Sequence, residues 1–233
     1  MTGQKALLLV GSPRGIDRSS SGRLGGRLLD ALKERGFETD KLHVHAVVHS
    51  PTETQNALAA IGAADVVVLS LPLYVDSFPA PVIALLERIA ERRTGTGRVR
   101  FLLLIQCGFP EREQNATALA IAERFAAEAG WEWLGGVAFG AMENYGGYAA
   151  EVLPRIAEAI ADGKPIPEVA LKRVMPAWLY RVGGNINRVT EPVANCFRTG
   201  KHLGIQPGGV KDMLEFMRDD IEDRTGVRVE VPL

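Results

Sequence analysis

The amino-acid sequence predicts an α/β fold, a five-stranded parallel sheet with helices on both faces. Short apolar runs alternate along the chain with longer stretches in which apolar residues recur every three or four positions. These are the patterns of buried strands and amphipathic helices, and short loops between them are typical of right-handed crossovers. The predicted strands span residues 6–10, 39–48, 65–71, 100–107 and 131–140. A helix follows the first strand, and the others span 53–63, 79–92, 112–129 and 148–162.

The first strand and its turn carry the most informative motif, GSPRGIDRSSS. The apolar run of residues 6–10 ends at Gly11-Ser12-Pro13, and Leu24, Leu28 and Leu32 then mark a helix that one of the three serines Ser19–Ser21 caps. A helix N-terminus offers unpaired N–H groups and the positive end of the macrodipole to an anion. Arg14 and Arg18 lie beside it. The turn therefore predicts a phosphate site, with an ordinary capped helix as the alternative.

The second strand, 39–48, is predicted from alternation, with Leu42, Val44 and Ala46 on one face and His43 and His45 on the other. The two histidines have the spacing of metal ligands on one face of a strand, but the sequence suggests no third ligand. We expect partly exposed histidines rather than a metal site.

The third and fourth strands fit the interior of a parallel sheet, because DVVVLSL and RFLLLIQC are almost continuously apolar. Between them, the helix over 79–92 presents Val82, Leu85, Leu86 and Ile89 as its buried stripe. The helix over 112–129 is expected to turn Leu119, Ala122 and Phe125 inward, and the helix over 148–162 Val152, Ile156 and Ile160.

Two further loops follow predicted strand ends, where parallel sheets bind ligands. The loop PLYVDSFPAP after the third strand holds Tyr74 and Phe78 among three prolines, which stiffen it. A flat heteroaromatic ring could lie against Tyr74; alternatively, both aromatics cover the core. The loop CGFPE follows the fourth strand and would lie beside it.

These three motifs, in order at three strand ends, resemble the NADPH-dependent FMN reductase branch of the flavodoxin-like superfamily, which includes flavin-dependent quinone and azo reductases. The resemblance covers residues 1–164 and implies a three-layer sandwich with strand order 2-1-3-4-5. It also implies an FMN site. The FMN-binding residues implied around the phosphate are Ser12, Arg14, Ser19, Ser20 and Ser21; those along the isoalloxazine are Pro72, Leu73, Tyr74, Val75 and Asp76; and those at its pyrimidine edge or ribityl chain are Cys107, Gly108 and Phe109.

The resemblance further implies an NAD(P)H-dependent oxidoreductase that passes hydride from NADPH or NADH through flavin N5 to a quinone, azo compound, nitro compound or free flavin. No catalytic side chain is expected, because the flavin carries the chemistry. Members build the flavin site near a subunit interface, which implies a homodimer or homotetramer. Two alternatives stay open: a flavodoxin-type electron carrier without NAD(P)H oxidation, and a flavin-less binding module of the same fold.

Charge and cysteine content exclude other classes of protein. The 233 residues include 27 basic and 28 acidic ones, a net charge of −1, so we expect no nucleic-acid partner. Strongly acidic composition is typical of diffusing carriers, and near-neutrality favours an enzyme. Cys107 and Cys196 lie far apart without CxxC spacing, and no apolar run approaches the about 18 residues of a membrane span. We expect a cytoplasmic protein that does not insert into membranes.

Residues 165–233 are predicted to form a mainly helical C-terminal extension. Leu214, Met217 and Ile221 have the spacing of one helix face. We expect this extension to pack on the first domain or on a dimer partner. The alternative is that a cluster around Trp178 and Tyr180 rests on a membrane surface and meets a lipid quinone.

Overall fold

A computed structural model describes residues 3–92, 99–107, 112–139 and 146–167 of the chain. The chain divides into two compact units, Met1–Val174 and Met175–Leu233, and every described residue lies in the first. The predicted boundary at residue 164 stays a prediction, and the extension expected beyond it falls almost wholly outside the described residues. None of the described helices is long and apolar enough to cross a bilayer.

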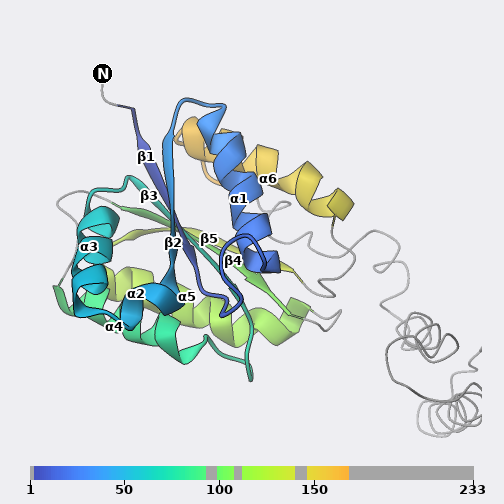
Figure 1. The fold of residues 1–233 in the computed structure, drawn as a ribbon. Coiled ribbons are helices and arrows are strands. Elements are labelled where there is room, and N and C mark those ends of the chain that lie inside the picture. The colour runs from blue at the N-terminus through green and yellow to red at the C-terminus, as the bar shows by residue number, and fades with distance from the viewer. Residues whose placement is uncertain (1–2, 93–98, 108–111, 140–145, 168–233) are drawn as a thin grey trace, which may run out of the picture. The chain divides into compact units, whose positions relative to one another are not determined.

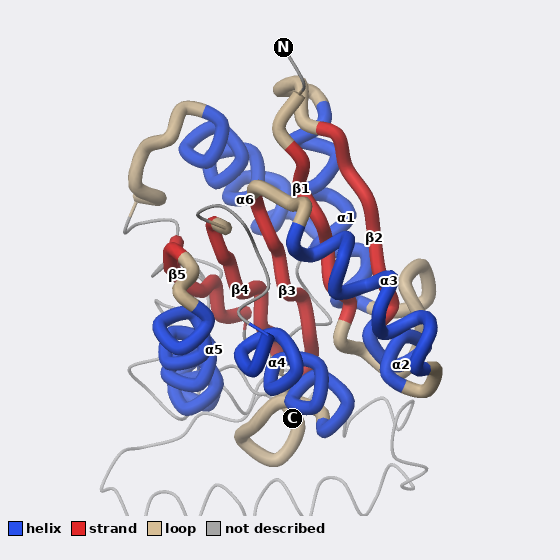
Figure 2. Tube along the Cα trace, turned by 90° about the vertical axis from the view of Figure 1, so that its left-hand side faces the viewer, coloured by secondary structure: helices blue, strands red, loops and turns tan. Residues whose placement is uncertain are grey.

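The described residues form a five-stranded, all-parallel sheet with the order β2-β1-β3-β4-β5. This order confirms the three-layer prediction. The strands are β1 (Lys5–Val10), β2 (Glu38–His43), β3 (Val66–Pro72), β4 (Arg100–Gln106) and β5 (Glu132–Phe139). Figure 2 looks onto one face of this sheet, with β5 at one edge and β2 at the other.

Helices cover both faces of the sheet (Figure 1). On one face lie α1 (Ser20–Lys33) and α6 (Gly146–Ala161); on the other lie α2 (Val44–Val48), α3 (Pro51–Gly62), α4 (Ala80–Arg92) and α5 (Ala116–Ala129). Alternate residues of each central strand enter the two cores, so that Leu8 and Val68 pack beneath α1 whereas Leu9 and Leu69 pack beneath α4. The predicted stripe of α4 is buried throughout.

The prediction of a strand over 39–48 is wrong in its second half. β2 ends at His43, which pairs with the last residue of β1, Val10, and the chain then turns into the short helix α2. An edge strand has no second neighbour, so it has no ladder to continue once its one partner ends. Val44 and Val47 are buried at helical spacing, and this packing decides the conformation.

The predicted helix over 112–129 also begins differently. Arg112–Asn115 is a turn of 3-10 helix, and α5 starts at Ala116. At its other end Gly130 adopts the left-handed conformation, with φ of 72°, that ends many helices. Phe125 and Ala122 face the core as expected, and Leu119 is half-buried against it.

Candidate functional site

Three chain segments meet at the carboxyl edge of the sheet. β1, β3 and β4 are neighbours in register, with Val10 opposite Ser70 and Pro72 opposite Gln106. The turn after β1, the loop after β3 and the residue after β4 therefore leave the sheet side by side. This edge is where doubly wound sheets bind their ligands.

The turn after β1 is packed closely against the sheet at its start. The N–H of Gly11 donates to the Ser70 carbonyl at 2.8 Å. A Cβ on Gly11 would come within 2.7 Å of Val82 Cγ2 and 2.8 Å of Leu71 Cβ, so only glycine fits there. Ser12 is buried, and its hydroxyl accepts a hydrogen bond from the Arg14 N–H at 3.3 Å.

The three serines of the motif have different environments. Ser19 is the N-cap of α1: its hydroxyl accepts from the Gly22 N–H at 3.0 Å and donates to the Ile16 carbonyl at 3.3 Å. Ser21 is fully buried, and its hydroxyl accepts from Gln106 Nε2 at 2.7 Å. Ser20 is half-buried and accepts from Arg23 Nη2 at 3.1 Å. The capping prediction is confirmed for Ser19, whereas Ser20 is the one whose hydroxyl faces solvent.

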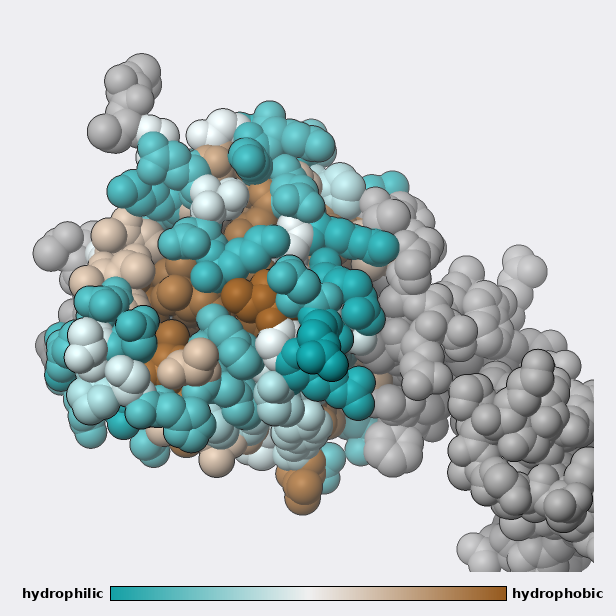
Figure 3. Space-filling model, viewed as in Figure 1, coloured by the Kyte–Doolittle hydropathy of each residue, from teal (hydrophilic) through white to brown (hydrophobic). Residues whose placement is uncertain are grey.

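The two arginines of the turn have no bonded partner among the described residues. Arg14 and Arg18 are both exposed, and neither guanidinium makes a hydrogen bond or ion pair with another residue in the described part of the chain. Figure 3 shows a strongly hydrophilic surface where this turn lies in Figure 1. The Ser19 hydroxyl caps the Gly22 N–H, whereas the N–H groups of Ser20 and Ser21 have no partner within the helix.

The loop after β3 forms a tight hairpin. Tyr74 and Ser77 exchange two backbone hydrogen bonds of 3.0 Å, and the two residues between them, Val75 and Asp76, have φ of 48° and 57°. A β-branched residue in this region is strained. Val75 is 98% exposed and Tyr74 46%, and the hairpin projects as a hydrophobic knob in Figure 3.

The remaining side chains of this loop are less accessible. Phe78 is buried in the core, so the alternative interpretation holds for Phe78 but not for Tyr74. Pro72 and Leu73 are half-buried, and the N–H of Leu73 donates to the Gln106 carbonyl at 2.7 Å. Tyr74, Val75 and Asp76 are thus the part of the predicted ring site that solvent reaches.

Cys107 directly follows β4 and is buried. Its N–H donates to the Phe139 carbonyl, and its thiol accepts from Asn115 Nδ2 at 3.3 Å. The thiol therefore faces the protein interior. Gly108 and Phe109, the other two residues predicted here, lie outside the described residues.

Two residues beside the turn were not predicted to belong to the site. His43 Nε2 lies 2.8 Å from the Ser12 carbonyl oxygen, and His45 Nε2 lies 3.2 Å from that of Gly11. Both side chains are half-buried, which agrees with the expectation of partly exposed histidines. No group of three His, Cys, Asp or Glu side chains among the described residues could hold a metal ion. The sequence held no signal for these contacts, because the strand over 39–48 was predicted to continue past both histidines.

Comparison with known proteins found a family match over the first half of the chain. Residues 4–109 match the family of NADPH-dependent FMN reductases, a range that includes the turn after β1 and the hairpin after β3. No curated protein sequence matches the chain.

Solved structures share the fold at low sequence identity. An NADH:FMN oxidoreductase is 16% identical over 72% of this chain and 94% of its own, with a TM-score of 0.55. An FMN-dependent NADH-azoreductase of Bacillus anthracis is 15% identical over 68% of this chain and 100% of its own, with a TM-score of 0.55. A Streptococcus pneumoniae flavodoxin is 13% identical over 69% and 99%, with a TM-score of 0.51.

These matches confirm the flavodoxin-like fold and the resemblance to the NADPH-dependent FMN reductases. With the family match, the predictions of an FMN-dependent oxidoreductase, of FMN as cofactor and of a nicotinamide co-substrate are confirmed as well. The fold alone does not separate a reductase from a carrier, because the flavodoxin shares it.

Proposed function

We propose that this chain, whose residues 4–109 match the NADPH-dependent FMN reductases, binds the FMN phosphate at the turn after β1 and passes hydride from NADPH or NADH to an electron-poor acceptor. The observation that carries the proposal is the pair of unpartnered arginines, Arg14 and Arg18, at the N-terminus of α1. Guanidinium groups bind phosphate through strong charge-assisted hydrogen bonds, and the N-terminus of a helix also favours an anion.

The described residues fit an FMN phosphate. Ser20 offers a hydroxyl, and the N–H groups of Ser20 and Ser21 in the first turn of α1 have no intrahelical partner. The hydroxyls of Ser19 and Ser21 already have protein partners, so we assign them the role of shaping the helix N-terminus. Arg14 and Arg18 would supply the countercharge.

The hairpin after β3 fits the isoalloxazine ring. Tyr74 presents a partly exposed aromatic face, and the prolines and the two cross-hairpin hydrogen bonds fix the loop before a ligand arrives. When bound, FMN supplies the hydride-transfer chemistry. The chain would hold the ring against Tyr74 and Val75, which are exposed to solvent. Such an open site suits quinones, azo compounds, nitro compounds or free flavin as acceptors.

Steady-state turnover tests the proposal. The purified full-length chain is supplied with FMN, NADPH and a water-soluble benzoquinone, and no other protein. We expect NADPH oxidation that depends on the quinone. A chain that binds FMN but oxidises no NADPH without a partner reductase would be an electron carrier instead.

A matched pair of variants at Ser20 tests the phosphate position in the same assay. Ser20→Glu sets a carboxylate against the phosphate, so the FMN concentration for half-maximal turnover should rise at least tenfold. Ser20→Ala removes one hydroxyl and should change that concentration by less than about fivefold. Equal values for the two variants would place the phosphate elsewhere.

The assembly into a homodimer or homotetramer, which the resemblance implies, is also proposed. Light scattering during size-exclusion chromatography of the full chain measures it directly. A monomer at micromolar concentration would contradict this part of the proposal without affecting the FMN site.

A further inference from the structure

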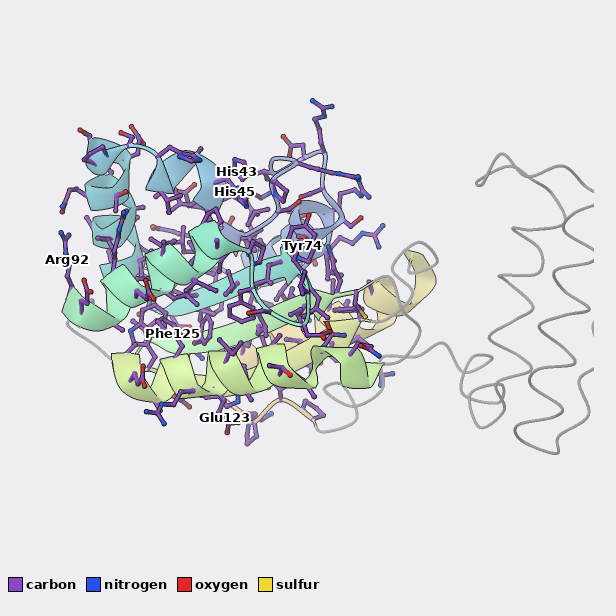
Figure 4. The ribbon with its side chains drawn as sticks, turned by 90° about the horizontal axis from the view of Figure 1, so that it is seen from below. His43, His45, Tyr74, Arg92, Glu123 and Phe125 are labelled. Atoms are coloured by element: carbon purple, nitrogen blue, oxygen red, sulfur yellow. The ribbon has the colours of Figure 1, made fainter. Side chains whose placement is uncertain are left out.

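Two imidazole rings lie over the peptide groups that begin the phosphate turn. β1 and β2 pair up to Val10 and His43, and the chain then continues into Gly11 and Ser12 without a partner on the β2 side. At this point His43 Nε2 reaches the Ser12 oxygen at 2.8 Å, and His45 Nε2 reaches the Gly11 oxygen at 3.2 Å. The two rings stack with centroids 5.7 Å apart and an interplanar angle of 21°. Figure 4 shows both histidines together beside the turn.

The carbonyl partners determine that Nε2 of His43 and His45 carries a hydrogen. A carbonyl oxygen can only accept, so each Nε2 must carry the hydrogen and donate it. The imidazoles thus supply donors to the Gly11 and Ser12 carbonyls at a point where β2 no longer runs beside β1. The chain changes from strand to helix at His43. Helix α2 turns the side chain of His45 toward β1, two residues after the last pair of the β1–β2 ladder.

We propose that His43 and His45 are positioning residues, which orient the turn after β1 for the phosphate of FMN. This inference rests on the proposed function. All peptide bonds of the described chain are trans, and in a trans peptide the C=O and the next N–H point in opposite directions. The bond from His45 to the Gly11 carbonyl therefore directs the Ser12 N–H away from the imidazoles.

The second bond acts on the next peptide. Pro13 has no N–H, so the Ser12–Pro13 peptide has its carbonyl as its sole hydrogen-bonding group, and His43 holds it. The Ser12 hydroxyl in turn accepts from the Arg14 N–H. A chain of contacts thus runs from His43 through Ser12 to the backbone of Arg14, one of the two arginines assigned to the phosphate.

His45 acts as a hydrogen-bond donor and not as the countercharge of the phosphate. Burial lowers the pKa of His45, against the opposing effect of the Gly11 hydrogen bond, and the neighbouring imidazoles of His43 and His49 lower it further. A metal site is a poorer explanation, since both Nε2 atoms already face carbonyl oxygens and the described residues contain no cluster of three ligands.

The test compares the affinities of FMN and riboflavin, because riboflavin lacks the phosphate. Dissociation constants are measured by quenching of flavin fluorescence on the full-length chain. The variants His43→Leu and His45→Leu remove the hydrogen-bond donor. The variants His43→Gln and His45→Gln place an amide N–H near the position of Nε2. His49→Leu is the matched control, because His49 is exposed and its side chain makes no hydrogen bond with the described residues.

We expect each leucine variant to bind FMN about fivefold more weakly, which is the effect of one lost hydrogen bond, with riboflavin affinity unchanged within twofold. The glutamine variants should recover most of the FMN affinity, and His49→Leu should match the wild type. A leucine variant that fails to fold is replaced by the corresponding alanine.

Two results would overturn the inference alone. They are leucine variants that keep the wild-type preference for FMN over riboflavin, and leucine variants that lose both ligands equally, as general loosening of α2 would produce. If instead the wild-type chain binds FMN no better than riboflavin, the phosphate site of the proposed function fails, and the inference fails with it.

Discussion

The two ends of the sheet differ in how their polar groups are satisfied. At the amino end, charged side chains are paired: the Asp65 carboxylate accepts from the Lys5 N–H at 2.7 Å, and Arg100 Nη1 donates to the Ile160 carbonyl at 2.7 Å. At the carboxyl end, Arg14 and Arg18 make no hydrogen bond or ion pair with the described residues. The exposed large apolar side chains of the described residues are Tyr74, Val75 and Ile83.

This difference separates stability from function. Groups that bond to each other at the amino end hold the strands in register. At the carboxyl end, the groups that have protein partners, such as Ser19 and Ser21, lie beneath those that have none. The buried set shapes the helix N-terminus, and the exposed set is available to an anion and a flat ring.

The largest expected effect comes from charge reversal at the phosphate turn. In the Arg14→Glu/Arg18→Glu double variant, two attractions become repulsions, so we expect FMN to bind at least 100-fold more weakly while riboflavin is unaffected. Isothermal titration of both ligands measures this. The control is Arg35→Glu, since Arg35 lies at the other end of α1 and bonds to the Ala31 carbonyl. An equal loss of both flavins would show that the double variant acts on the ring site or on the fold.

Removal of the aromatic face should act on both flavins. Tyr74→Ala deletes the stacking surface of the hairpin, so FMN and riboflavin should each bind about five- to tenfold more weakly. The ratio of the two affinities should stay at the wild-type value. A change in this ratio, measured in the same titrations, would mean that Tyr74 lies near the phosphate and not along the ring.

A substitution at the amino end should lower the stability of the chain and leave its FMN affinity unchanged. Asp65→Ala removes the acceptor of the Lys5 N–H, which lowers the free energy of unfolding by about 1 kcal/mol. Urea unfolding followed by circular dichroism measures this change. FMN affinity of the folded variant should equal that of the wild type, and a weaker affinity would contradict the separation of the two ends.

The smallest effect concerns the histidine beside the turn. Because the pKa of His45 is lowered in the folded chain from its ordinary value of 6.5, the unfolded chain takes up this proton first as the pH falls through 6.5. The free energy of unfolding should therefore decrease below that pH, and His45→Gln should lose this part of the decrease. Parallel pH curves for the two proteins, recorded by urea unfolding, would show that His45 does not contribute.

Most of the fold was predictable because the spacing of apolar residues in the sequence indicates which residues are buried. The runs at β3 and β4 are buried on both faces of the sheet, and the i, i+3, i+4 pattern of α4 is buried throughout. The prediction failed at residues 44–48, where alternation and helical spacing coincide over five residues. There β2 ends, and the burial of Val44 and Val47 at helical spacing decides the conformation.

The candidate site was predictable at the level of the loops but not of each side chain. The sequence placed all three serines around a phosphate, yet Ser21 turns inward because the buried Gln106 of β4 donates to it. His43 and His45 were assigned no role in the site, since the carbonyls that they hold belong to another strand. In both cases the deciding partner is distant in sequence, by 85 residues for Ser21 and by 31 and 34 for the histidines.

The central claim is that this chain holds FMN and lets a nicotinamide reduce it. The most direct measurement is the visible absorption spectrum of the purified full-length chain after FMN loading and removal of excess ligand, followed by anaerobic addition of NADPH. We predict flavin bands that co-purify with the protein and bleach when NADPH is added. A colourless protein that FMN cannot tint, or a flavin spectrum that NADPH leaves unchanged, would contradict the account.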